Sequence, residues 1–136
     1  MNYKGYCLWA SDIPNANAPH YIVIVSDTNL KQECLVVAIS SIKYRADGTP
    51  KYYDKSCELS VDDIVDDNGN NVLTKPSFMR YEYSTAISSS ELFMKQVFAK
   101  YTYKCKITNQ LLQRIQKGAM ISKDLPEVFH EFFEYF

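Results

Sequence analysis

The sequence has no surplus of positive charge and no long apolar run. Its 15 Lys and Arg residues are set against 16 Asp and Glu residues, a formal net charge of −1. This excludes an overall basic field for non-specific nucleic-acid binding but not a local basic patch. No apolar run approaches the roughly 20 residues that a membrane-spanning helix needs. Residues 1–7 also lack the apolar core of a signal peptide, so we expect a cytoplasmic protein without a membrane segment.

Several catalytic and metal-binding motifs are missing as well. No G-x-S-x-G elbow is present, which disfavours a Ser-His-Asp hydrolase. The four cysteines form no C-x-x-C pair, whereas a four-thiolate metal site normally has paired ligands, so we expect reduced and mostly buried thiols. The acidic run 62–67 lacks the alternate spacing and closing Glu of an EF-hand loop, which favours a solvated turn. We therefore predict neither a metal ion nor a cofactor.

The size and the order of patterns indicate one domain of the α+β class. At 136 residues with 46% hydrophobic content, the chain is long enough to bury its own core, and we treat residues 1–136 as a single domain. Strand patterns come first and helical periodicities follow. We predict a small, strongly bent antiparallel β-barrel over about 1–107, with a helical insertion over about 89–100 and C-terminal helices over about 108–136.

The clearest strand signal is a hairpin in the first third of the chain. Two β-branched apolar runs, 21–25 and 34–39, flank a polar loop, and their nearly continuous apolar character predicts central strands covered on both faces. In an antiparallel pair the start of one strand lies beside the end of the next. This places His20 near the hydroxyls of Ser40 and Ser41 at one end of the sheet.

Further strands are predicted by alternation along the rest of the chain. The segments concerned are 3–9, 54–60, 78–87 and 101–107, with 61–65 as another half-buried piece. Strict alternation within 78–87 puts Arg80 and Glu82 on one face and Tyr81 and Tyr83 on the other.

Three helices are predicted near the C-terminus. A capping box at Ser88 opens a helix over 89–100, and Thr108 caps a second helix. A further capping box at Asp124 precedes apolar residues at helical spacing, which predicts an amphipathic helix over 125–136. This helix either packs on its own domain or binds a partner or second subunit.

Residues 42–55 combine tyrosines with basic side chains. The residues concerned are Tyr44, Arg45, Lys51, Tyr52, Tyr53 and Lys55. Aromatic rings stack on unpaired bases and cations hold phosphates, so this segment is the best local candidate for a nucleic-acid or anion surface. A solvated loop whose tyrosines pack on the barrel is the alternative.

Taken together, these patterns resemble the MazF/PemK-like toxin endoribonucleases, which are built on an SH3-like barrel. In that family a basic residue leads into an apolar strand that closes on Ser, and residues 19–26 here read Pro-His-Tyr-Ile-Val-Ile-Val-Ser. The family's next strand ends in a hydroxyl pair, matched here by Ser40 and Ser41. Its later strands resemble 57–60 and 72–87, and its Leu-x-x-Ile helix resembles 111–115.

The resemblance covers about residues 19–118 and has three departures. The family's catalytic arginine aligns with His20, the hydroxyl that closes the second strand is Ser instead of Thr, and residues 122–136 lie outside the family's usual core. The resemblance implies a metal-independent endoribonuclease that cuts single-stranded RNA, forms a homodimer and is held in check by an antitoxin protein.

RNA cleavage by internal attack sets three chemical requirements. A group must take the proton of the 2′-hydroxyl, others must stabilise charge on the phosphate, and one must protonate the leaving 5′-oxygen. Imidazole changes charge near neutral pH, so we expect His20 to be catalytic, with Ser41 hydrogen-bonded to the phosphate. The candidates for substrate binding are Ser40, Lys75, Ser77, Arg80 and Arg45. The second histidine, His130, is expected on a solvated face.

A non-catalytic SH3-like barrel that binds a protein or a nucleic acid is the alternative function. Barrels of this shape occur both in nucleases and in non-catalytic binding modules, so the fold alone does not decide between these two functions. The lack of net positive charge favours the binding module, whereas the pairing of His20 with Ser41 favours the nuclease.

Overall fold

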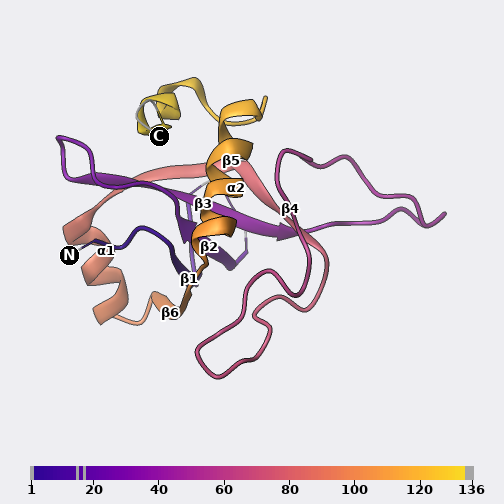
Figure 1. Ribbon diagram of the computed structural model, residues 1–136, viewed down its shortest axis with the longest axis horizontal. Coiled ribbons are helices and arrows are strands. Elements are labelled where there is room, and N and C mark those ends of the chain that lie inside the picture. Colours follow the sequence, from indigo (N-terminus) through magenta and orange to yellow (C-terminus); the bar gives the residue numbers. More distant parts are fainter. Residues whose placement is uncertain (1, 15, 17, 134–136) are drawn as a thin grey trace.

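The computed structural model describes residues 2–14, 16 and 18–133 (Figure 1). Within these residues the chain is α+β, and six antiparallel strands form one curled, half-barrel sheet in the order β4-β5-β3-β2-β1-β6. The strands are β1 (Tyr6–Ala10), β2 (His20–Ile24), β3 (Glu33–Ser41), β4 (Glu58–Leu59), β5 (Ser77–Ser88) and β6 (Tyr101–Lys106). The helices are α1 (Ser89–Val97), α2 (Asn109–Ile121) and the 3-10 helix η1 (Glu127–Phe133).

The predicted hairpin is confirmed as β2 and β3, the centre of the sheet. Tyr21 pairs with Ile39 and Ile24 pairs with Val36, so His20 and Ser40 lie together at the end of the pair. Both faces of the hairpin are covered, because residues 22–25 and 34–40 are all buried. The continuous apolar runs in the sequence arise from this two-sided burial.

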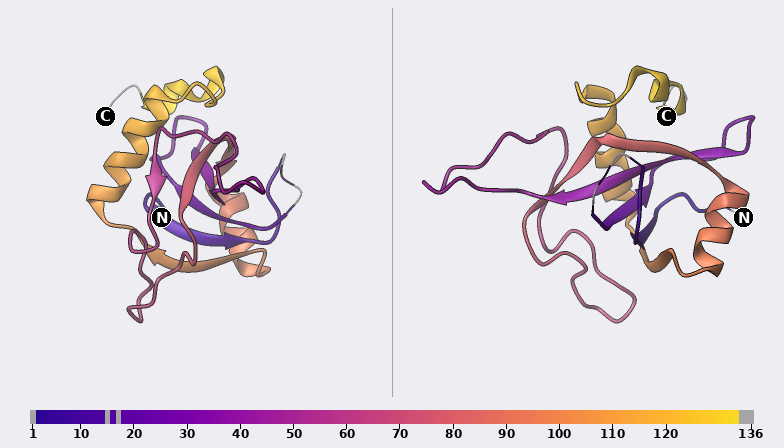
Figure 2. Two further views of the ribbon diagram at one scale, coloured as in Figure 1. Left: turned by 90° about the vertical axis from the view of Figure 1, so that its right-hand side faces the viewer. Right: turned by 180° about the vertical axis from the view of Figure 1, so that it is seen from behind.

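Two apolar cores lie on the two faces of the sheet. The first, which we call the α2 core, includes Val23, Val37, Met79, Ile115 and Phe133. The second, which we call the α1 core, includes Leu8, Ile22, Val36, Ala38 and Leu92. Figure 2 (left) shows α2 and α1 on opposite sides of the curled sheet.

Two of the three predicted N-caps, Ser88 and Thr108, are confirmed. The Ser88 hydroxyl accepts a hydrogen bond of 3.1 Å from the Glu91 N–H, and the Thr108 hydroxyl accepts one of 3.1 Å from the Leu111 N–H. Each bond satisfies an N–H that the first helical turn leaves without a partner. The first helix ends at Val97, three residues before the predicted end.

The predicted strand over 54–60 is reduced to β4, and 61–65 forms a turn followed by a single β-bridge, Val65 to Asn71, instead of a strand. Asp54 accepts a hydrogen bond of 2.9 Å from the Ser56 N–H, and Asp63 accepts one of 2.7 Å from the Ser60 N–H. These side chains occupy backbone donors that a strand ladder would use. Local hydrogen bonding therefore outcompetes the alternation of the sequence.

The predicted amphipathic α-helix over 125–136 is not confirmed. The described part of this segment forms the 3-10 helix η1, and residues 134–136 lie outside the described residues. Pro126 precedes η1, and its carbonyl accepts a hydrogen bond of 3.0 Å from the Phe129 N–H, the i→i+3 pattern of a 3-10 turn. Leu125 and Phe133 are still buried in the α2 core. The apolar spacing therefore predicted correctly that this segment is buried, but it did not distinguish a 3-10 helix from an α-helix.

The pairing of β5 with β3 has a large register shift, after which the side chains of β5 point to the opposite faces of the sheet from those that alternation predicts. Ala38 pairs with Arg80, whereas the adjacent Val37 pairs with Ser84, so residues 81–83 have no counterpart on β3. A bulge of this kind bends the strand and changes which side chains share a face. Tyr83 consequently packs against the α1 core, not on the face of Tyr81 as strict alternation predicted.

A hairpin arm follows β3, formed by residues 42–53. Its rungs include the Lys51 N–H to Lys43 carbonyl bond of 2.8 Å and the Arg45 N–H to Thr49 carbonyl bond of 2.7 Å. The turn uses Gly48 at φ +88°, where a side chain would be strained. The arm projects from the body of the protein (Figures 1 and 2).

None of the helices in the described part of the chain is long and apolar enough to cross a bilayer.

Candidate functional site

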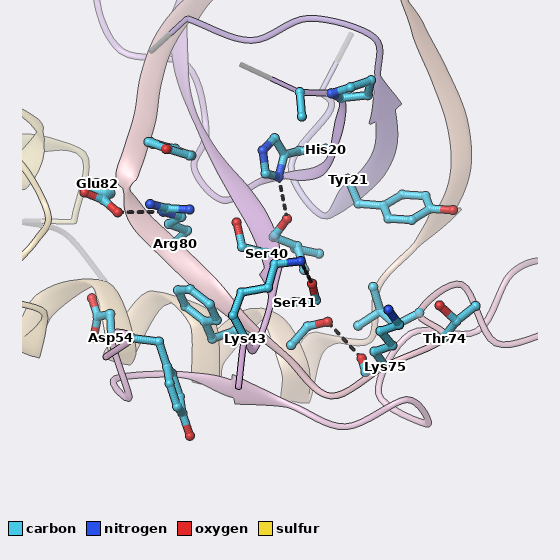
Figure 3. A pocket seen from close by; sticks show the side chains of 18 of the residues that line it. His20, Tyr21, Ser40, Ser41, Lys43, Asp54, Thr74, Lys75, Arg80 and Glu82 are labelled. Atoms are coloured by element: carbon cyan, nitrogen blue, oxygen red, sulfur yellow. Dashed lines mark hydrogen bonds and ion pairs between the residues drawn. The ribbon is translucent and has the colours of Figure 1, made fainter. Parts of the chain in front are cut away.

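A cleft of about 840 Å³ opens at the start of β2, the end of β3 and the start of β5, bounded by the arm and the segment after α2. It brings together six of the seven residues predicted as catalytic or substrate-binding. These six are His20, Ser40, Ser41, Lys75, Ser77 and Arg80 (Figure 3). The seventh, Arg45, lies in the arm, where its guanidinium bonds to Thr49 and Pro50, and it does not line the cleft.

The imidazole of His20 is held in one orientation. Its Nδ1 lies 3.0 Å from the Ile39 carbonyl oxygen (dashed line from His20 in Figure 3). Its ring packs edge-on against Tyr83, with ring centres 5.8 Å apart. A carbonyl oxygen only accepts hydrogen bonds, so Nδ1 carries the proton in this contact. The neutral ring therefore leaves Nε2 as the nitrogen able to accept a proton.

The neighbouring hydroxyls differ in how they are engaged. The Oγ atom of Ser40 is buried and has no hydrogen-bond partner, the one such side-chain atom in the described part of the chain. Ser41 accepts a hydrogen bond of 2.9 Å from the Lys43 ammonium, and Ser77 donates one of 2.9 Å to the Lys75 carbonyl. A buried hydroxyl without a partner is unfavourable, so Ser40 keeps an unused hydrogen-bonding group beside His20.

Two cations approach the same part of the cleft. Lys43 extends toward Ser41 from the base of the arm (Figure 3). Arg80 pairs through Nε with Glu82 at 2.6 Å and lies 4.0 Å over the ring of Tyr83. The ion pair uses only the Nε–H of Arg80, so its two terminal amino groups are available to an anion.

Sequence reasoning missed Lys43 and Tyr83. Lys43 follows Ser41 by two positions, and that spacing was a usable signal, because residues two apart on an extended chain point the same way. Tyr83 carried no such signal, since its place beside Arg80 depends on the irregularity of β5.

The cleft also has acidic lining residues, Asp54, Glu82 and Asp124, which we call the acidic wall. Asp54 is buried, and its carboxylate accepts hydrogen bonds from the Ser122 hydroxyl and the Ser56 N–H. Burial raises the pKa of Asp124, and the negative charges of Asp54 and Glu82 raise it further. Because Glu82 is itself paired with Arg80, acidic and basic side chains alternate along the cleft, which suits a ligand that presents both an anion and hydrogen-bond donors.

The remaining chemically active side chains lie elsewhere. All four cysteines are free thiols and buried, as the sequence predicted. His130 is exposed on η1, outside the cleft. No three His, Cys, Asp or Glu side chains within residues 2–14, 16 and 18–133 are grouped so as to hold a metal ion.

Comparison with other proteins assigns neither a family nor a function to this chain. Neither a protein-family model nor a curated protein matches this sequence. Functional inference therefore depends on the cleft itself.

Proposed function

We propose that the cleft binds single-stranded RNA and cleaves it without a metal ion, by attack of a 2′-hydroxyl on the adjacent phosphate. The observation that carries this proposal is the pairing of His20 with Ser40. The first has its tautomer set by the Ile39 carbonyl, and the second has a buried hydroxyl without a partner. Lys43 and Arg80 line the same cleft as these two residues.

The residues supply each chemical requirement. His20 Nε2 accepts the proton of the 2′-hydroxyl, whose oxygen forms a bond to phosphorus as the bond to the 5′-oxygen breaks. The hydroxyls of Ser40 and Ser41 donate to the phosphate oxygens, and the terminal amino groups of Arg80 offset their growing charge. Lys43, held 2.9 Å from Ser41, gives a proton to the leaving 5′-oxygen. The products are a 2′,3′-cyclic phosphate and a 5′-hydroxyl.

The curled sheet also supports a place for this chain as a divergent, SH3-like member of the MazF/PemK-like group. In this proposal His20 takes the place of the family's arginine, and the hydroxyls of Ser40 and Ser41 take the place of its threonine pair. The proposal extends to a homodimer restrained by an antitoxin protein.

The test is cleavage of a long, unstructured RNA by purified protein in excess chelator. General base catalysis contributes about 10²- to 10⁴-fold, so His20→Ala lowers the rate by at least about 100-fold. His130→Ala is the matched control, because it removes the other, exposed histidine and leaves the cleft intact. We expect cuts at a recurring short sequence, with cyclic phosphate ends. If folded wild-type protein cuts none of several RNAs, the nuclease proposal is wrong.

A non-catalytic binding module is the second candidate, and the acidic wall favours it. Asp54, Glu82 and Asp124 repel a phosphate backbone and attract cationic or donor-rich ligands. In that case Glu82→Gln strengthens RNA binding by lowering repulsion, yet no product with a cyclic phosphate end forms. The same cleavage assay therefore separates the two functions.

A further inference from the structure

A second pocket of about 520 Å³ lies directly beside the cleft. Its walls include Lys51, Tyr52, Tyr53, Lys55, Ile121 and Lys123, and we call it the lysine pocket. Residues 51–54 line both the cleft and the lysine pocket. This short strip of chain therefore separates two openings that a single extended ligand can occupy together.

The lysine pocket has a charge unlike that of the cleft. Its three lysines, Lys51, Lys55 and Lys123, are all exposed. Its one carboxylate, Asp54, is buried and occupied by Ser122 and the Ser56 N–H. Positive charge therefore predominates at the surface of the pocket, as a phosphate backbone requires.

The strip between the two openings presents an unusual aromatic residue. Tyr52 is 81% exposed, and its hydroxyl makes a long contact of 3.5 Å to Asp124. Tyr53, next to it, is engaged: its ring packs at 5.2 Å on Phe78, and its hydroxyl donates to Glu58. The Tyr52 ring is thus the one on this strip that is open to stacking on an unpaired base.

We propose that the lysine pocket binds the nucleotides next to the cleaved bond, so that one strand of RNA passes over Tyr52 between the two openings. A base stacks on the Tyr52 ring, and the phosphates that follow contact Lys51, Lys55 and Lys123. This inference rests on the proposed function, because it assigns the cleft to the scissile phosphate. It names the substrate as a single strand several nucleotides long, since a duplex cannot offer an unstacked base.

Binding is measured with a fluorescent 12-mer of 2′-O-methyl RNA of mixed sequence, which lacks the attacking hydroxyl. Loss of one stacked base weakens binding by about 5- to 100-fold, so we expect Tyr52→Ala to do so and Tyr52→Phe to retain affinity. Lys123→Ala lowers the slope of log affinity against log salt by about 0.7. Tyr103→Ala and Lys117→Ala are the matched controls, since both residues are exposed and line neither opening.

Cleavage separates this inference from the nuclease proposal. Lys123→Ala raises KM for a 12-mer RNA, while the rate on a dinucleotide, which is too short to reach the lysine pocket, stays unchanged, because Lys123 does not line the cleft. If wild-type protein cleaves RNA and the Tyr52 and Lys123 variants bind and cleave as it does, the lysine pocket is not a binding site. If the protein binds the 12-mer through Tyr52 but never cleaves RNA, the lysine pocket is an RNA-binding site and the nuclease proposal is wrong. An absence of both binding and cleavage overturns both.

Discussion

The guanidinium of Arg80 lies 4.0 Å from the ring centre of Tyr83, on one face of β5, although the two residues are three positions apart. Residues at that spacing in a regular strand point to opposite faces. The unpaired residues 81–83 remove this restriction, and the Tyr83 ring contacts both Arg80 and His20.

The Tyr83 ring is therefore expected to position two site residues at once. Tyr83→Leu removes a cation–π contact of about 0.5–1 kcal/mol and frees both side chains, so the free energy of unfolding falls by about 1 kcal/mol. The rate of RNA cleavage falls about 10-fold or more, because imidazole and guanidinium lose their fixed geometry. Urea unfolding and the cleavage assay measure the two effects. Tyr83→Phe keeps the ring and should preserve both; equal losses in the two variants would contradict the positioning role.

Ser40 and Ser77 are expected to respond in opposite ways to the loss of a hydroxyl. The buried Ser40 Oγ has no partner, so Ser40→Ala leaves stability unchanged or raises it by up to about 1 kcal/mol. Ser77 donates to the Lys75 carbonyl, so Ser77→Ala lowers stability by about 1 kcal/mol. Chemical denaturation distinguishes them. RNA cleavage should drop for Ser40→Ala despite its stability, and a fully active variant would exclude Ser40 from the site.

Gly118 is a helical glycine that alanine should not improve. Alanine normally stabilises a helix interior by about 1 kcal/mol over glycine. Here an added Cβ would lie 2.9 Å from both the Ser56 carbonyl oxygen and Cys57 Cβ, and overpacking of this kind costs about 1–3 kcal/mol. We expect Gly118→Ala to lower the free energy of unfolding by about 1–2 kcal/mol, measured by urea denaturation. Gln113→Ala, on the exposed side of the same helix, should change it by less than about 0.5 kcal/mol.

Asp124 should make the protein relatively more stable in acid. Burial, then the charges of Asp54 and Glu82, raise the pKa of its carboxyl, so the folded chain binds this proton more tightly than the unfolded chain does. The stabilisation is complete below the unfolded pKa and is lost as pH rises through the folded pKa. Asp124→Asn is therefore more stable than wild type at pH 7, by less than about 1 kcal/mol because the site is partly solvated.

The measurement is the difference in unfolding free energy between Asp124→Asn and wild type, followed from pH 7 down to pH 4, over which it should shrink. Asp47 provides a comparison of opposite sign, because hydrogen bonds from Thr49 lower the pKa of its carboxyl. Its stabilisation is present at pH 7 and is lost in acid, so Asp47→Asn is less stable than wild type at neutral pH. A difference for Asp124→Asn that grows in acid would refute the assigned environment.

The central part of the fold was predictable because its signals are local or of short period. The β-branched apolar runs of β2 and β3 indicate buried strands. The caps at Ser88 and Thr108 each bond to an N–H only three residues further along the chain. The proximity of His20 to Ser40 followed from the antiparallel pairing alone. These features depend on a few neighbouring residues, so one sequence is enough to find them.

The rest depended on contacts between distant segments. The acidic wall requires Asp54 and Asp124, which meet only after the segment following α2 folds back on the arm. The helical spacing over 125–136 was satisfied by a 3-10 helix, since burial of Leu125 and Phe133 does not need α-helical hydrogen bonds. The alternating sequence of β5 gave no sign of the register shift that leaves residues 81–83 unpaired.

The Ser122–Asp54 hydrogen bond has a consequence for the timing of synthesis. It joins residues 68 positions apart, and it fixes the strip that forms one wall of the cleft. A ribosome-bound chain that has released β1 to β5 still holds Ser122 and Asp124 inside the exit tunnel, so its cleft has no finished wall. The cleft is therefore completed only after the segment that follows α2 has been made and has folded back onto the arm.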